Sequence, residues 1–134
     1  MREHLERYLA NIVDPTFEDY RRNSMSVRHA FVTSLVTYHA IDRAAYPKSS
    51  RTLLQQWRAK SQEFMLVEIV ALQFKHVTSD DLRKPAPKGA IRIQMALGLD
   101  ETAETVELHH LLFLVRDAIK FLHKQVEENA QSSV

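Results

Sequence analysis

The chain has 134 residues, of which 45% are hydrophobic and 26% are charged, and its formal net charge at pH 7 is +1. These values are typical of one globular domain with a hydrophobic core, and so small a net charge argues against a protein that holds nucleic acid by charge alone. The absence of cysteine excludes disulfides, thiolate metal sites and cysteine nucleophiles. Since no uncharged apolar run approaches the roughly 20 residues that span a bilayer, the sequence predicts a soluble, cytoplasmic protein with no membrane partner.

The first half of the chain predicts helices throughout, over residues 2–13, 15–22, 25–46, 50–59 and 61–77. Apolar residues at helical spacing form the stripe of the first helix: Leu5, Tyr8, Leu9, Ile12 and Val13. The dipeptide Asp14-Pro15 is expected to stop that helix and start the next, with Asp14 as N-cap. Ser24 or Ser26 is expected to cap the third helix, and Ser61 the fifth.

The sequence of the second half of the chain predicts a loop, one or two strands and a final helix. Residues 78–89, with two prolines and a glycine, are expected to form a loop, and the alternating apolar residues of 90–97 predict a strand. Residues 104–109 fit either a second strand or the start of the last helix, which is clear over 108–128. The tail at 129–134 is expected to be disordered. The expected fold is therefore a mainly α, single-domain helical bundle over residues 1–128, with about five to six helices and room for a small β-hairpin near 90–108.

The two helices at 25–46 and 61–77 carry few charges, which predicts that both are central to the bundle. In the first of them, neighbours are expected to approach closely on a side of small residues, while His39 lies on the bulkier side, which faces the core. The helix ends in the polar group His39, Asp42 and Arg43. Its simplest interpretation is a structural cap in which Asp42 pairs with a nearby arginine.

A metal site is the alternative interpretation of that polar end. If helices 25–46 and 61–77 run parallel, Asp42 and His76 lie at the same end of the bundle. An antiparallel last helix would bring His109 or His110 to that end as well. Imidazole and carboxylate groups on facing helices can bind zinc, iron or manganese. The sequence thus offers His39, Asp42 and His76 as candidate metal ligands.

A second candidate site lies on the last helix, where Arg116 and His123 are two helical turns apart and share a face. This spacing is common by chance, and Arg22 and His29 repeat it elsewhere in the chain, so an ordinary solvated face is the alternative. Phe113 lies on the same exposed side. An aromatic residue there indicates either a partner surface or a second core layer, and homodimerisation through this helix agrees with both.

The segment "RDAIKFLH", which begins at Arg116 and ends at His123, resembles a motif of Higher Eukaryotes and Prokaryotes Nucleotide-binding (HEPN) domains. Ribonucleases of this all-α family carry an arginine and a histidine, separated by four to six residues, in a late helix. A polar residue often follows the arginine, as Asp117 does here. The resemblance implies that Arg116 and His123 lie in a catalytic cleft formed between two protomers.

Two further segments, "SVRHAFVTSLVTYHAIDRAAYP" and "EFMLVEIVALQFKH", are similar to stretches of small bacterial helical proteins of no known activity. This second resemblance implies a helical fold only. The leading functional hypothesis is a non-catalytic binding or accessory protein that forms a homodimer, has a protein partner and needs no cofactor. One alternative is a HEPN-like ribonuclease or toxin component that acts on RNA through Arg116 and His123. The other is the metal-binding bundle, so the sequence leaves open whether the protein is an enzyme.

Overall fold

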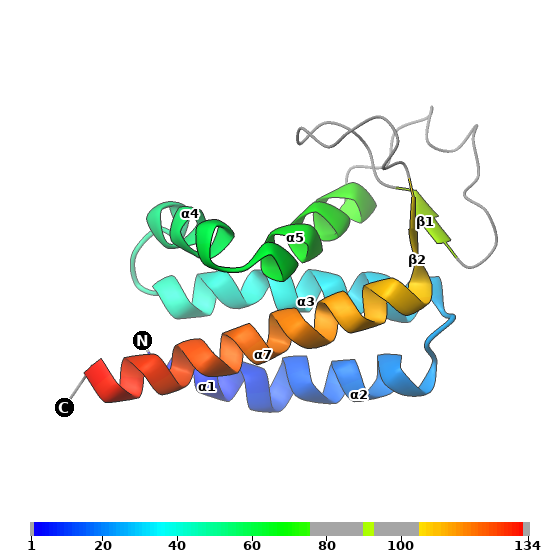
Figure 1. The fold of residues 1–134 in the computed structure, drawn as a ribbon. Helices are drawn as coiled ribbons and strands as arrows, with labels where there is room; N and C mark the ends of the chain where they lie inside the picture. Colours follow the sequence, from blue (N-terminus) through cyan, green and yellow to red (C-terminus); the bar gives the residue numbers. More distant parts are fainter. Residues whose placement is uncertain (1, 76–89, 93–104, 133–134) are drawn as a thin grey trace.

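The computed structural model describes residues 2–75, 90–92 and 105–132, and it confirms the expected mainly α bundle (Figure 1). The elements in chain order are α1 (Arg2–Tyr8), the π-helix η1 (Leu9–Val13), α2 (Asp14–Arg22), α3 (Val27–Ala45), α4 (Arg51–Lys60), α5 (Gln62–Lys75), β1 (Ala90–Arg92), β2 (Thr105–Glu107) and α7 (Leu108–Ser132). Among these described elements, no helix is both long enough and apolar enough to cross a membrane.

The long helical segments alternate in direction along the bundle (Figure 1). α1, η1 and α2 form one continuous rod, α3 returns beside it, α5 runs back again, and α7 returns parallel to α3. α3 packs against the rod, α5 and α7, so it is central to the fold as expected. The short helix α4 packs against α5 and the end of α3.

The predicted break at Asp14-Pro15 is wrong. Asp14 has helical backbone angles and its backbone N–H bonds to the carbonyl of Leu9, five residues earlier, so the chain passes through a π-helical turn instead of stopping. Proline lacks an N–H and its ring crowds the carbonyl four residues before it, and a wider turn relieves both problems. The additional residue in this turn also explains why Ile12, expected in the apolar stripe, is exposed while Leu9 and Val13 are buried.

α3 begins at the second of the two expected caps, because the hydroxyl of Ser26 accepts the N–H of His29 at 3.2 Å. Its side of small residues is buried, as expected for close helix packing: Ala30, Thr33, Ser34, Thr37, Ala40, Ile41 and Ala45. The expectation that His39 faces the core is wrong, since its side chain is 43% exposed. The size of the side chains, more than their hydrophobicity, decides which face the neighbouring helices approach.

Aromatic rings fill the core where α4, α5 and α7 meet. Trp57 packs edge-on against both Phe64 and Phe121, with ring centroids 5.1 and 5.5 Å apart. The hydroxyl of Ser61 accepts the N–H of Phe64 at 3.0 Å, which confirms the expected cap of α5. Arg58 of α4 binds the buried carboxylate of Glu68 through two hydrogen bonds, and this bonding raises the pKa of Arg58.

The expected hairpin is present near α7. β1 pairs antiparallel with β2, with Ala90 opposite Glu107, and α7 begins directly at Leu108. The predicted loop at 78–89 and the end of the predicted strand at 93–97 lie outside the described residues. α7 runs to Ser132 and so includes residues that were expected to be disordered. No glycine or proline follows Leu108, so nothing in the sequence stops the helix earlier.

Candidate functional site

The polar end of α3 forms a local pair between two of its own side chains. His39 Nδ1 lies 3.2 Å from Asp42 Oδ2, and both side chains are exposed. α5 runs antiparallel to α3, because α4 turns back beside the end of α3, and α7 begins at the opposite end of the bundle (Figure 1). The predicted convergence of His39 and Asp42 with His109 or His110 is therefore wrong, and His76 lies outside the described residues.

An open pocket of about 510 Å³ surrounds this polar end. The guanidinium of Arg43 lies 5.3 Å from the ring centroid of Tyr8, whose hydroxyl donates to the carbonyl of Val36 at 2.7 Å. Burial raises the pKa of Tyr8. These contacts tie α3 to α1, so this group of side chains has a structural use that needs no ligand.

Arg116 and His123 share an exposed face of α7, as their spacing predicts, and their side chains are 43% and 47% exposed. His123 also meets a carboxylate from a distant part of the chain. Its Nε2 lies 3.0 Å from Asp14 Oδ1 and 3.1 Å from Oδ2, across a separation of 109 residues. A carboxylate only accepts hydrogen bonds, so Nε2 is the donor in this pair, and in a neutral imidazole Nδ1 is then the nitrogen with a lone pair.

Arg116 has two contacts on the same helix. Its Nε donates to Asp117 Oδ1 at 3.1 Å, and its guanidinium carbon lies 4.9 Å from the ring centroid of Phe113. The Phe113 ring, against which the guanidinium stacks, is still accessible to solvent, since the residue is 49% exposed. A guanidinium carries five N–H donors, so one bond to Asp117 does not exhaust its capacity for an anionic group.

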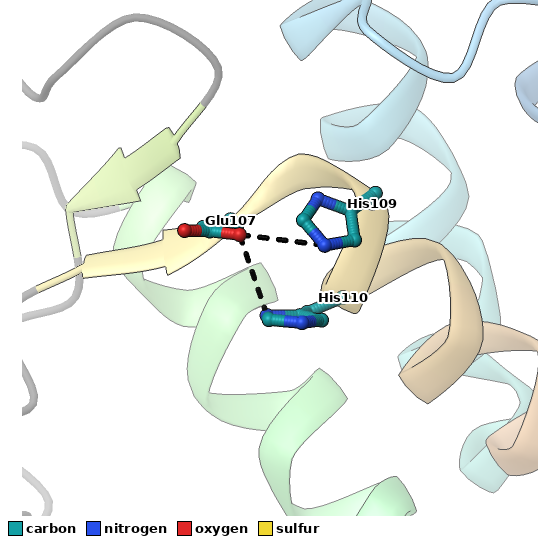
Figure 2. Close-up of side chains that lie close together, drawn as sticks. All are labelled: Glu107, His109 and His110. Atoms are coloured by element: carbon teal, nitrogen blue, oxygen red, sulfur yellow. Dashed lines mark ion pairs between the residues drawn. The ribbon is translucent and has the colours of Figure 1, made fainter.

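A third group, which we call the Glu107 cluster, comprises Glu107, His109 and His110 at the junction of β2 and α7. Figure 2 shows both imidazole rings near the same carboxylate. Glu107 Oε2 lies 3.4 Å from His109 Nε2 and 3.7 Å from His110 Nδ1. The ligand atoms of the three residues all lie within 4.8 Å of one another, so one ion could contact all three.

Sequence reasoning missed two of the residues in these groups. Nothing in the sequence links Asp14 to His123, because their contact depends on how the rod packs against α7. Glu107 was overlooked although the string "ELHH" places a carboxylate beside two histidines. That string is a usable signal for a cluster, because three potential metal ligands occur within four residues.

Searches for related proteins gave no match among family models, curated proteins or solved structures.

Proposed function

We propose that this protein is a homodimer that cleaves RNA at the exposed face of α7, with His123 as the acid–base group and Arg116 as the phosphate-binding group. The observation that carries the proposal is the bond between His123 and Asp14. It holds the imidazole in one tautomer on the same exposed face of α7 as Arg116. The proposal also agrees with the resemblance to HEPN ribonucleases.

His123 has the chemistry to start the reaction. A histidine takes up and releases protons near neutral pH, and here Asp14 fixes the proton on Nε2. Nδ1 can then accept the proton of a ribose 2′-hydroxyl, whose oxygen attacks the adjacent phosphorus. The bond from phosphorus to the 5′-oxygen breaks, and that oxygen takes up a proton from water as it leaves. Asp14 stabilises the imidazolium that forms in the first step.

Arg116 supplies positive charge for the phosphate on which negative charge accumulates. Lys120 lies between Arg116 and His123 in the sequence and is also exposed, so three groups that can carry positive charge occupy successive turns of α7. Such a stripe attracts the RNA backbone despite the small net charge of the chain.

A homodimer would complete this site. Arg116 and His123 are separated by about 10.5 Å along the helix axis, which is long for two groups acting on one phosphate. A second copy packed against the same face would cover Phe113 and place another Arg116 and His123 along one cleft. A two-fold interface is self-complementary and requires no other surface.

Asp14→Asn tests the observation on which the proposal depends. We expect this variant to cleave a fluorescein-labelled, single-stranded RNA about 10- to 100-fold more slowly than the wild type, as part of the roughly 10²–10⁴-fold that general acid–base catalysis contributes. The amide keeps the shape of the side chain but can neither stabilise an imidazolium by charge nor enforce one tautomer.

Asp19→Asn is the matched control, because Asp19 is an exposed carboxylate on the same helix. It should cleave the RNA as fast as the wild type. Equal rates for Asp14→Asn and the wild type would overturn the assigned role of the pair, and a wild-type protein that cleaves no RNA would overturn the proposed function.

A non-catalytic binding protein is the second candidate, and the contacts of Arg116 favour it. Its guanidinium already engages Asp117 and Phe113, as a side chain within a protein-binding surface often does. Aromatic and arginine side chains are enriched at the centres of protein interfaces. Under this alternative the homodimer binds a protein partner through α7, and the RNA assay shows no cleavage.

A further inference from the structure

We infer that the Glu107 cluster is a binding site for a divalent transition-metal ion of the zinc class. Two neutral imidazoles and one carboxylate are a ligand set that Zn²⁺ accepts, with the fourth position left to water or another small ligand. This inference concerns the opposite end of the bundle from the pair His39 and Asp42, and it does not depend on RNA cleavage.

The distances agree with ligands arranged around one ion. Ligand atoms about 2.0–2.1 Å from a tetrahedral Zn²⁺ are about 3.3–3.4 Å from one another. Glu107 Oε2 is 3.4 Å from His109 Nε2 and 3.7 Å from His110 Nδ1. The remaining ligand distances do not exceed 4.8 Å, and the three side chains that would move to bind an ion are exposed.

Hydrogen bonds between the three side chains explain the distances in the Glu107 cluster less well than a shared ion does. Bonds from nitrogen to oxygen are usually about 2.7–3.2 Å long, and both contacts of the cluster are longer than that. The pair of His123 and Asp14, at 3.0 Å, is a contrasting case, because two groups there satisfy each other directly. In the Glu107 cluster two imidazoles lie near one carboxylate oxygen, and neither is at an ordinary hydrogen-bond distance from it.

The backbone that carries these ligands is held in place by the core. Leu108, between Glu107 and the two histidines, is buried, and its carbonyl accepts the hydroxyl of Tyr20 at 3.1 Å. Burial raises the pKa of Tyr20, so this hydroxyl stays protonated and remains a donor at neutral pH. The junction from strand to helix is thereby fixed before any ion binds, which lowers the entropy cost of binding.

The site is open to solvent, since the three side chains are 56–63% exposed. Water therefore competes for the ion, and the open coordination position can accept an oxygen ligand. An ion held by three protein ligands and water is the arrangement found at catalytic zinc sites, whereas structural sites use four protein ligands.

Calorimetric titration of the untagged full chain with ZnCl₂, in a buffer without phosphate or chelator, tests this inference. We expect saturable binding of one ion per chain, and a visible absorption band of tetrahedral Co²⁺ when cobalt replaces zinc. His109→Ala, His110→Ala and Glu107→Gln should each weaken Zn²⁺ binding by at least about tenfold, since even supporting residues around a metal typically contribute that much. Circular dichroism verifies that each variant is folded.

His39→Ala is the matched control, because His39 is an exposed histidine paired with a carboxylate outside the cluster. It should bind Zn²⁺ as tightly as the wild type. The inference is overturned if the wild type binds no Zn²⁺, if the cluster variants bind it unchanged, or if His39→Ala weakens binding as much as they do. Because the titration contains no RNA, its failure leaves the proposed ribonuclease standing, and the reverse also holds.

Discussion

His123→Ala is expected to slow RNA cleavage by at least about 100-fold, the lower limit of what a general acid–base group contributes. The variant loses the atom that accepts the 2′-hydroxyl proton, but it retains Arg116 and Lys120, so RNA should bind within a few-fold of the wild-type affinity. The side chain is 47% exposed, and surface substitutions usually change the free energy of unfolding by less than about 0.5 kcal/mol. Cleavage rates and fluorescence anisotropy, measured on the same RNA, separate the two effects.

Free imidazole gives a test of this role that a purely structural residue would fail. Added at high concentration, it should restore part of the activity of His123→Ala, because it can occupy the space left by the side chain and accept the proton. His39→Ala, which removes an exposed histidine elsewhere, should cleave RNA normally with or without imidazole. A His123→Ala protein that retains wild-type activity would rule out His123 as the catalytic group.

Phe64→Ala is expected to lower the free energy of unfolding by about 3–5 kcal/mol, the usual cost of removing a large buried aromatic side chain. Phe64 is fully buried, and its ring lies 5.1 Å from that of Trp57 and 6.2 Å from that of Phe121. It therefore contacts α4 and α7 at once, and neither helix can move inward to fill the space without losing its other contacts. Urea unfolding followed by circular dichroism measures the change.

Met25→Ala provides the control for this substitution, because Met25 is also large and apolar but 61% exposed. It should change the free energy of unfolding by less than about 0.5 kcal/mol. Phe64→Leu should fall between the two, since it keeps most of the buried volume. A loss below 1 kcal/mol for Phe64→Ala would contradict the described packing of α4, α5 and α7.

The helices could be predicted from the sequence where local signals decide them. Ser26 and Ser61 cap α3 and α5 as expected, because a hydroxyl near the first turn accepts an N–H wherever the helix packs. The continuation through Pro15 could not be predicted in the same way. A π-helical turn and a helix break both satisfy the constraints of proline, and only packing of Leu9 and Val13 into the core selects the turn.

The directions of the helices were beyond the reach of sequence patterns. A short intervening helix allows α3 and α5 to be parallel or antiparallel, and the choice depends on whether α4 traverses the bundle or turns back. The alternative in which His109 or His110 joins His39 and Asp42 required α7 to run antiparallel to α3, and the structure shows these two helices parallel. His76, the remaining candidate ligand, lies outside the described residues. Close packing on the small-residue side of α3 was predicted correctly, but the placement of His39 toward the core was wrong.

In the candidate sites, too, features set by spacing along one helix could be predicted, whereas contacts between distant segments could not. Arg116 and His123 are seven positions apart, which places them on one face of any helix, so their alignment follows from the sequence. The carboxylate that bonds to His123 belongs to Asp14, which is 109 positions away in the sequence, so this contact does not follow from local spacing. Adjacent histidines on a helix point about 100° apart, so the Glu107 cluster required the junction of β2 and α7, which the sequence left undecided.

The chemical ends of cleaved RNA test the central claim most directly. We would incubate the purified wild-type chain with single-stranded RNA in EDTA, which removes any contribution of a metal ion at the Glu107 cluster, and analyse the products by mass spectrometry. Attack by a 2′-oxygen predicts fragments with 2′,3′-cyclic phosphate and 5′-hydroxyl ends, and no cleavage of DNA of the same sequence. Intact RNA, or fragments with 5′-phosphate ends, would contradict the assignment of the α7 face as a ribonuclease site.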